Sequence, residues 1–249
     1  MATIAVGDIH GNLPALKDVL AQLCRVVVEG DVVVFLGDYI DRGRDSRACV
    51  DAILSFRNEV PAPVVCLRGN HEDWLLRTLM DYSRHSWLVG MGAFDTIRSY
   101  SPGAASALRE AVGIRLFFGR YVLPYGLFFN SMPPTHRAFF TQLKLCFQSS
   151  DCICTHAGLN PTVDRLEKQP SESLIWGQED FPFGYNGDDV VVYGHWGNAA
   201  TDSTGWPEPR IVGRTIGIDT IANGVLTAVR MPDWRIFQSQ RYEKMGLGV

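Results

Sequence analysis

The stretch VVVFLGDYIDRG, residues 32–43, joins a run of buried-strand composition to a turn rich in glycine and acidic residues. Four other stretches have the same form, an apolar run that ends in a short polar motif: GDIHG at 7–11, GNHE at 69–72, THAG at 155–158 and YGH at 193–195. Loops that leave the carboxyl ends of strands build the binding crevice of an open α/β sheet. We therefore expect the five motifs to meet in space, although they are far apart in the sequence.

The remaining sequence predicts an α/β protein around these motifs. Apolar runs predict strands at Thr3–Val6, 32–36, Val64–Leu67, Cys152–Cys154, Val190–Tyr193, Thr215–Ile218, Val225–Arg230 and Trp234–Gln238. Helical periods predict helices that begin near Pro14, Ser46, Glu72 and Pro134, with Ser46 as a helix cap. The Asn223-Gly224 pair predicts a hairpin turn between the two strands that flank it.

Residues 81–130 depart from this rhythm, because glycines interrupt their periodicity. We expect a helical and irregular insertion there, within a single domain that spans residues 1–249. The arginines of this segment either meet a polyphosphate or form a solvated face; they are Arg84, Arg98, Arg109, Arg115 and Arg120.

Composition excludes several classes of function. The chain has 249 residues, 46% hydrophobic, with a net charge of -4, so it can bury a large core but lacks the basic footprint of a duplex nucleic-acid binder. No apolar stretch reaches the ~18 residues of a membrane span, and the N-terminus has no secretion signal. The six cysteines lie mostly in apolar stretches and suggest no disulfide framework. We expect a cytoplasmic protein for which no oligomer is indicated.

The motifs supply six side chains of the kinds that bind divalent metals: Asp8, His10, Asp38, Asn70, His156 and His195. Asp8 and His10 are two residues apart, so on an extended segment both would point toward one ion. Asp38 can bridge this ion to a second one through its two carboxylate oxygens, with the other three side chains completing the second ion. Two such ions hold a hydroxide and both phosphate oxygens for in-line attack on phosphorus.

Neighbouring residues extend the prediction from metal binding to catalysis. His71 adjoins Asn70 and can protonate the leaving oxygen as a general acid. Asp41 can orient that imidazole and favour its protonated form. Arg42 can bind the phosphate oxygens with its planar guanidinium, and we expect Asn70 to contact the phosphate as well.

In this order the motifs resemble those of the phosphoprotein phosphatases among the calcineurin-like metallophosphoesterases. The bacterial and phage branch is most similar, with its serine/threonine phosphatases and symmetrical diadenosine tetraphosphatases. PPTHRAFFTQL at 133–143, LIWGQEDF at 174–181 and IGIDT at 216–220 also have counterparts there, so the resemblance extends from Ala2 to about Arg230. It implies a four-layer fold with a central β-sandwich flanked by helices. It also implies two divalent ions, with manganese preferred and iron or zinc as alternatives.

Three functions remain open at this point. The first is a serine/threonine protein phosphatase, with dual specificity allowed; the alternative is symmetrical hydrolysis of a dinucleoside polyphosphate such as diadenosine tetraphosphate. A catalytically inactive binding module is the third. Gln178 stands near the place where relatives often carry a phosphate-binding arginine, a role that Arg214 could take over. Trp196 follows His195 where relatives more often have threonine, and it could cover the pocket or stack on an adenine.

Overall fold

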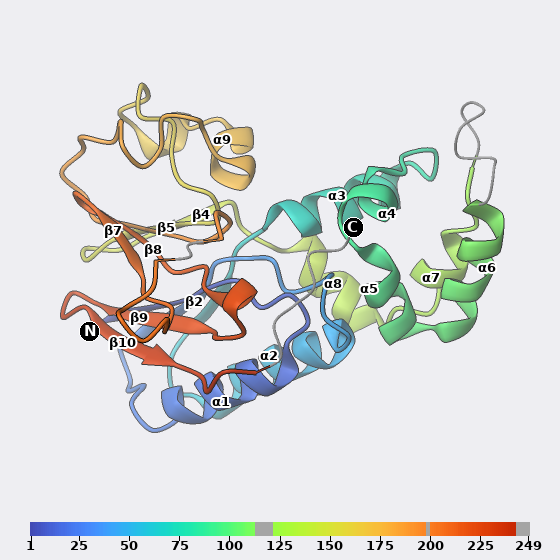
Figure 1. Ribbon diagram of the computed structural model, residues 1–249, viewed down its shortest axis with the longest axis horizontal. Coiled ribbons are helices and arrows are strands. Elements are labelled where there is room, and N and C mark those ends of the chain that lie inside the picture. Colours follow the sequence, from blue (N-terminus) through green and yellow to red (C-terminus); the bar gives the residue numbers. More distant parts are fainter. Residues whose placement is uncertain (113–121, 198–199, 243–249) are drawn as a thin grey trace.

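The apolar runs form two five-stranded sheets in the computed structural model, which describes residues 1–112, 122–197 and 200–242 (Figure 1). The first sheet has the order β10-β9-β1-β2-β3. Its strands are β1 (Thr3–Val6), β2 (Val32–Phe35), β3 (Val64–Cys66), β9 (Thr227–Met231) and β10 (Arg235–Gln238). The first three are parallel, whereas β9 runs antiparallel to both β1 and β10.

The second sheet has the order β4-β5-β6-β8-β7. Its strands are β4 (Cys146–Gln148), β5 (Ile153–Thr155), β6 (Val191–Tyr193), β7 (Arg210–Val212) and β8 (Thr215–Gly217). The central three are parallel and the two edge strands are antiparallel to their neighbours. The edge strands β4 and β7 were not predicted from the sequence.

The sheets pack face to face, which explains why their strands are apolar on both sides. In β1, Ala5 faces the core between the sheets, where it meets Val192 and Ile216 of the second sheet. Its neighbours Ile4 and Val6 face the opposite way, into the core beneath the helices. A strand that is buried on both faces reads as a continuous hydrophobic run, as β1 does.

Helices cover the outer faces of both sheets. The first sheet is covered by α1 (Leu13–Leu23), α2 (Ser46–Glu59), α3 (Asn70–Met80) and α8 (Pro134–Thr141), whose apolar faces share one core with its strands. The short helix α9 (Ser171–Trp176) lies over the second sheet (Figure 1). Its Leu174 packs with Ile153 and Val191. The result is the predicted α/β fold, four layers with the two sheets at the centre.

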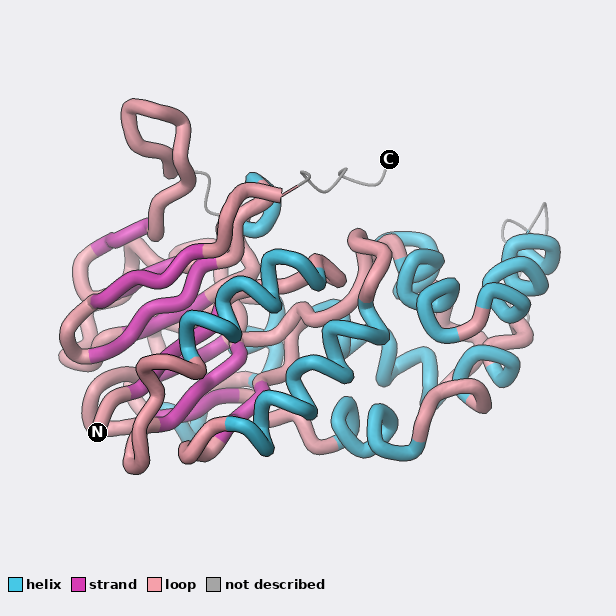
Figure 2. Tube along the Cα trace, turned by 90° about the horizontal axis from the view of Figure 1, so that it is seen from below, coloured by secondary structure: helices cyan, strands magenta, loops and turns pink. Residues whose placement is uncertain are grey.

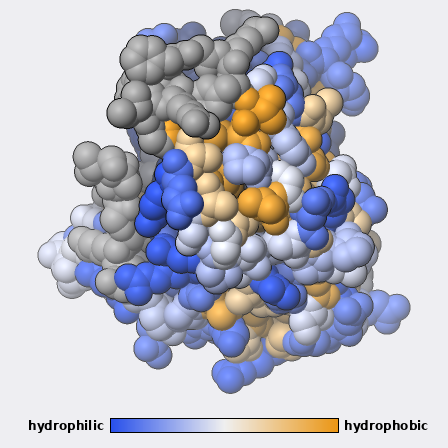
Figure 3. Space-filling view, turned by 90° about the vertical axis from the view of Figure 1, so that its right-hand side faces the viewer, coloured by the Kyte–Doolittle hydropathy of each residue, from blue (hydrophilic) through white to orange (hydrophobic). Residues whose placement is uncertain are grey.

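Four helices extend beyond the sheets at one end of the molecule: α4 (Ser86–Gly90), α5 (Ala93–Tyr100), α6 (Pro102–Val112) and α7 (Gly126–Phe129) (Figures 1 and 2). Trp87, Tyr100, Phe128 and Phe129 of this α4–α7 segment belong to the same core as α1 and α2. Figure 3 looks onto this end and shows apolar side chains among polar ones at its surface.

The described arginines of residues 81–130 have local partners. Arg84 pairs with Asp81 at 3.4 Å, Arg98 pairs with Asp95, and Arg109 lies over the ring of Phe94. These contacts favour the solvated-face interpretation. Arg115 and Arg120 lie outside the described residues.

Two local predictions were wrong. Asn223-Gly224 does not form a hairpin, because β8 and β9 belong to different sheets. Gly224, at φ 77°, ends a 3₁₀ turn (Ile221–Asn223) in the connection between them. Ser46 is the first residue of α2 rather than its cap, and its hydroxyl accepts the N–H of Asp41 at 3.2 Å. As expected, no helix among the described residues is long and apolar enough to cross a membrane.

Candidate active site

The predicted site residues lie at one edge of the two sheets, each just after a parallel strand. Asp8 follows β1, Asp38 follows β2, and Asn70 begins α3 after β3. In the second sheet, His156 follows β5 and His195 follows β6. Side chains from positions 8 to 195 therefore meet in one place, as the strand-end argument predicted.

The backbone of these loops is strained. His10, Asp38, Asp41, Arg42 and His195 all have positive φ, between 45° and 68°, which non-glycine residues rarely adopt. Each such residue costs on the order of 1–3 kcal/mol and persists only where its surroundings hold it. Their concentration around a buried carboxylate marks this region as the functional site.

Asp38 is at the centre of the site. Its Oδ2 lies 3.4 Å from Nε2 of His10 and 3.8 Å from Nε2 of His71. Its other oxygen, Oδ1, lies 3.5 Å from Nε2 of His156. Burial alone would raise the pKa of Asp38, but the surrounding histidines, His156 foremost, hold it well below the ordinary value. One ionised carboxylate thus faces two separate groups of ring nitrogens.

The histidines present their metal-binding nitrogens to Asp38. His10 Nδ1 lies 3.0 Å from the carbonyl of Ile40, and His156 Nδ1 lies 3.1 Å from the carbonyl of Leu36. An N–H donated to a backbone carbonyl leaves a lone pair on the opposite Nε2, the usual arrangement of histidine ligands. Burial lowers the pKa of both rings, which favours the neutral form that binds metals.

Asn70 and His195 complete the second group. Oδ1 of Asn70 lies 3.1 Å from Nε2 of His156 and 3.2 Å from Nδ1 of His195. The same end of the amide is within 3.2 Å of both oxygens of Asp38. Burial and the neighbouring His156 lower the pKa of His195 to about 3. Lone pairs from four side chains converge here, an arrangement that suits a divalent cation.

Two sets of ligand atoms therefore share Asp38: His10, Asp38 and His71 form one, and Asp38, His156 and His195 form the other. Within each set the atoms lie within 4.8 Å of one another. The donor chemistry, imidazole and carboxylate with one amide oxygen, fits divalent transition metals. These residues could hold two ions with Asp38 between them.

Asp8 lies beside these sets rather than within them. Both of its oxygens accept the backbone N–H of His195, at 3.2 and 3.1 Å. Burial, followed by the negative charges of Asp219 and Asp38, raises the pKa of Asp8 well above its usual range. The group of ligand atoms around His10 and Asp38 does not include Asp8, so the pairing of Asp8 with His10 on one ion stays a prediction.

Glu72, the last residue of the GNHE motif, connects the loops after β2 and β3. Fully buried, it accepts the backbone N–H groups of Asp38 and Tyr39, both at 2.9 Å, and that of Gly69 at 3.1 Å. Burial and the charge of Asp38 raise the pKa of Glu72 to about 8. A Cβ at Gly69 would collide with the Asp38 carboxylate, so only glycine fits there. No role was predicted for Glu72 from the sequence.

Asp219 is a second residue that the sequence analysis missed, although it lies in the IGIDT stretch. It follows β8, is buried, and its Oδ2 accepts the N–H of Gly197 at 2.7 Å. Its Oδ1 is buried without a hydrogen-bond partner among the described residues. Burial and the charge of Asp38 raise the pKa of Asp219 to about 6. The signal that could have identified Asp219 is an acidic residue just after a sixth apolar run, which forms the parallel strand β8.

His71 and Asp41 form a buried pair. Nδ1 of His71 lies 2.8 Å from Oδ2 of Asp41, and both side chains are inaccessible to solvent. Nε2 of His71 has no hydrogen-bond partner among the described residues and faces the Asp38 carboxylate. Burial would lower the pKa of His71, but the carboxylates of Asp38 and Asp41 outweigh it and raise the pKa. The bond to Asp41 places an N–H on Nδ1, and the raised pKa favours a second proton on Nε2, the nitrogen that faces the candidate metal site.

Arg42 lies at the exposed side of the same turn. Its side chain makes no ion pair among the described residues. Its positive charge acts on Asp8, His10, His71, His156 and His195, and tends to lower the pKa of each. A free guanidinium beside buried metal-type ligands can receive a phosphate.

Among the described residues, no arginine was found to supply the phosphate contact that relatives make near Gln178. The amide of Gln178 donates to Ser173 at 2.8 Å. Arg214 is near Tyr185, on which its charge acts, and Val191 donates to its carbonyl. We find no support for Arg214 as a substitute phosphate ligand.

Trp196 lies against the site with part of its indole open to solvent. Its Nε1 donates to the carbonyl of Ala157 at 2.8 Å, and its ring packs over Gly177 and edge-on to His195. The residue is 40% exposed. The indole is thus fixed by three neighbours, next to a candidate metal ligand.

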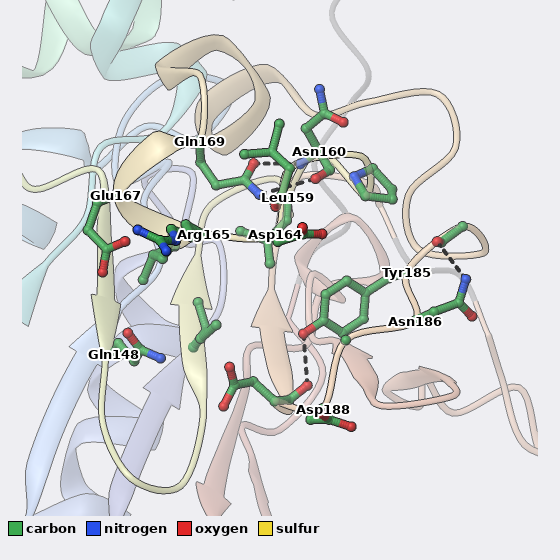
Figure 4. A pocket seen from close by; sticks show the side chains of 17 residues that line it. Gln148, Leu159, Asn160, Asp164, Arg165, Glu167, Gln169, Tyr185, Asn186 and Asp188 are labelled. Atoms are coloured by element: carbon green, nitrogen blue, oxygen red, sulfur yellow. Dashed lines mark hydrogen bonds between the residues drawn. The ribbon is translucent and has the colours of Figure 1, made fainter.

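A separate cavity of 710 Å³ opens beside the second sheet (Figure 4). Loops 159–169 and 184–189 line it, and none of the candidate ligands does. Gln169 fastens the first loop, accepting the N–H of Asn160 at 2.8 Å and donating to the carbonyl of Val163 at 2.8 Å. Residues 184–189 line this cavity rather than the site around Asp38.

Comparisons with known proteins identify the family of the chain. The model of the calcineurin-like phosphoesterase family matches residues 1–224. An asymmetrical bis(5'-nucleosyl)-tetraphosphatase of Geobacillus thermodenitrificans is 25% identical, covering 92% of this chain and 89% of its own. A symmetrical bis(5'-nucleosyl)-tetraphosphatase of Pectobacterium carotovorum is 26% identical, covering 95% and 94%.

Solved structures give the same fold. A crystal structure of a candidate diadenosine tetraphosphatase superposes with a TM-score of 0.64 at 18% identity, covering 97% of this chain and 94% of the other. A metallophosphoesterase of Sphaerobacter thermophilus gives a TM-score of 0.50 at 17% identity, covering 98% and 89%. The fold, the clustered ligands and the family match lead to one conclusion: the chain belongs to the calcineurin-like phosphoesterases, a family of hydrolases that use divalent metal ions.

Proposed function

We propose that this chain is a metal-dependent hydrolase of dinucleoside polyphosphates that cleaves a phosphoanhydride bond. Among the functions left open by the sequence, this was the alternative rather than the first expectation, a serine/threonine protein phosphatase. The observation that carries it is the pair of tetraphosphatases to which the chain is similar over 92% and 95% of its length. The buried ligand clusters around Asp38 support hydrolysis rather than an inactive binding module.

The metal chemistry follows from the ligand sets. Two divalent ions, manganese by preference, would be held by His10, Asp38, Asn70, His156 and His195, with Asp8 close by. When bound, such ions activate water and neutralise the charge that develops on phosphorus. Because the six cysteines are all free, we place this activity in the reducing cytoplasm.

The residues beside the metals have separate roles. Arg42 binds the phosphate oxygens, because its guanidinium is exposed and has no ion-pair partner among the described residues. Asn70 contacts the same phosphate from the start of α3. His71 donates the proton on Nε2 to the bridging oxygen as its bond to phosphorus breaks, and Asp41 holds the imidazole through Nδ1.

Trp196 is the residue that we assign to nucleobase binding. Its indole is fixed by the carbonyl of Ala157 and by packing against His195, yet it is 40% exposed. An aromatic platform next to the metals suits a purine attached to the phosphates, and stacking of this kind is worth about 1–3 kcal/mol per base.

The proposal is tested by incubating the manganese-loaded protein with diadenosine tetraphosphate and identifying the products. Two molecules of ADP would indicate symmetrical cleavage, and ATP with AMP would indicate asymmetrical cleavage. In parallel, Trp196→Ala should raise the KM for the dinucleotide about tenfold or more, the loss of one stacking contact. The KM for p-nitrophenyl phosphate, which has no base, should stay unchanged. Absence of nucleotide products with good turnover of p-nitrophenyl phosphate would reject the proposed substrate.

A further inference from the structure

We propose that helices α4 and α5 position the general acid, with Trp87 and Thr96 as positioning residues for the Asp41–His71 pair. From the sequence, this part of the chain was expected only to be a helical and irregular insertion. The inference rests on the proposed role of His71 in phosphoester hydrolysis.

The Asp41 carboxylate is held on both oxygens by side chains from these helices. Its Oδ2 accepts Nε1–H of Trp87 at 2.8 Å, beside the bond to His71. Its Oδ1 accepts the hydroxyl of Thr96 at 2.5 Å. Asp41, His71, Trp87 and Thr96 are all fully buried, so the bonds are shielded from competition by water. Both oxygens are therefore fixed by the protein itself.

The same helices hold the backbone of the turn. The N–H of Asp41 donates to Oγ1 of Thr96 at 2.8 Å. The hydroxyl oxygen of Ser46 is hydrogen-bonded to the same Oγ1 at 3.0 Å. Asp41 and Arg42 have φ values of 68° and 64°, a conformation that neither would keep without support. A Cβ on Gly92, which precedes α5, would lie 3.5 Å from the backbone nitrogen of Arg42. Contacts from α4 and α5 thus reach the side chain and the backbone of Asp41, and Gly92 lies close to the backbone of Arg42.

These bonds determine where the proton of His71 is delivered. Because Trp87 and Thr96 hold one oxygen of Asp41 each, its carboxylate plane is fixed and so is the direction of its bond to Nδ1. The ring of His71 is then oriented with Nε2 toward Asp38, 3.8 Å away. Neither Trp87 nor Thr96 is exposed, so neither touches substrate; each acts through Asp41.

The indole of Trp87 has a second, separable role in packing. Its ring lies 5.5 Å from the ring of Phe128 and 6.4 Å from that of Phe129. Phenylalanine at this position retains much of the ring packing and removes the N–H. Thr96→Val is close in shape and removes the hydroxyl from the other oxygen of Asp41. The two variants therefore test the same proposal from opposite sides of one carboxylate.

The experiment measures kcat and KM for phenyl phosphate and p-nitrophenyl phosphate, which differ mainly in the basicity of the leaving oxygen. A basic leaving oxygen requires protonation, whereas nitrophenolate leaves with little help. For Trp87→Phe and Thr96→Val we expect kcat on phenyl phosphate to fall about tenfold or more, part of the ~100- to 10,000-fold general-acid contribution. On p-nitrophenyl phosphate kcat should change less than about threefold, with KM and bound manganese unchanged.

Trp206→Phe is the matched control. Trp206 lies in the loop that precedes β7, and its Nε1 donates to Gln238 at 2.7 Å. The substitution therefore removes a similar indole hydrogen bond outside the proposed machinery. We expect it to leave both substrates unaffected. An equal loss on both substrates in the Trp87 and Thr96 variants would show a general structural defect and overturn the proposal.

Combination with His71→Asn provides the second readout. If Trp87 and Thr96 act through His71, their substitutions should cause no further loss of kcat in a His71→Asn background, because residues that act as a unit are non-additive. Further loss there would contradict the positioning role. If His71→Asn leaves kcat on phenyl phosphate unchanged, the general-acid assignment fails. If His71→Asn lowers this kcat but Trp87→Phe and Thr96→Val both match wild type, only the positioning role of Trp87 and Thr96 fails. Should Trp87→Phe not fold, Thr96→Val decides the outcome alone.

Discussion

The two ligand groups that share Asp38 differ in the protonation of their histidines. On the side of the first sheet, His71 has a raised pKa because Asp38 and Asp41 outweigh burial. On the side of the second sheet, burial lowers the pKa of His156, and the pKa of His195 falls to about 3. In the proposed mechanism the first group therefore contains a proton donor, whereas the histidines of the second serve as neutral ligands. One carboxylate can therefore serve two sites of unequal chemistry, because the group at the far nitrogen of each imidazole differs. It is Asp41 for His71 and the carbonyl of Leu36 for His156.

The largest effect is expected from Asp38, the residue common to both groups. Asp38→Asn removes the charge that faces His10 at 3.4 Å and His156 at 3.5 Å. Manganese binding should weaken at both positions, and kcat should fall at least about a thousandfold. Metal analysis after dialysis, together with kcat, checks this. A variant that retains two tightly bound ions would contradict the shared position of Asp38.

The next prediction separates the two groups. His71→Asn should lower kcat about 100- to 10,000-fold on a substrate with a basic leaving group while bound manganese is retained. His156→Asn should instead reduce bound manganese, because its Nε2 faces both Asp38 and Asn70. Metal content and kcat measured on both variants provide the check. Similar losses of metal in both would remove the distinction between donor and ligand.

A smaller effect is expected from the partner of the donor. A general acid must be protonated, so kcat on phenyl phosphate should fall as pH rises through the raised pKa of His71. Asp41→Asn removes a negative charge that raises this pKa, so the descending alkaline limb should move to lower pH. The pH dependence of kcat measures the shift. A limb that stays in place would mean that another group titrates there.

The smallest effect is expected from Asp219, which stands behind the second group. Its negative charge contributes to the raised pKa of Asp8. Asp219→Asn should lower that pKa, and it should change manganese affinity by no more than about 10- to 100-fold, as for other residues that support ligands. Titration with manganese measures this change. Complete loss of metal would instead make Asp219 a ligand.

The sequence predicted which polar residues meet at the strand ends better than it predicted the residues that hold them. Asp38, His71 and His156 were found because each follows an apolar run in a short polar motif. Trp87 and Thr96 lie 46 and 55 positions from Asp41, in helices without such a motif, so no local pattern indicated their bonds. Long-range hydrogen bonds to a buried carboxylate are a product of tertiary packing.

The errors in the fold have a similar cause. β4 and β7 are three-residue edge strands with partly exposed side chains, and their apolar pattern is therefore weak. Asn223-Gly224 has the local signal of a hairpin, but the chain crosses from one sheet to the other at that point. Local turn preference cannot distinguish these two connections, since both need a residue with positive φ.

The most direct test of the central claim compares kcat/KM of the manganese-loaded protein on diadenosine tetraphosphate and on a phosphothreonine peptide. Both substrates place a phosphorus atom on the same ligand groups, so the ratio reports recognition beyond the metals. We predict a ratio of at least about 100 in favour of the dinucleotide, as expected when a base and further phosphates add about 3 kcal/mol of binding. A ratio that favours the peptide would contradict the account and make this chain a protein phosphatase.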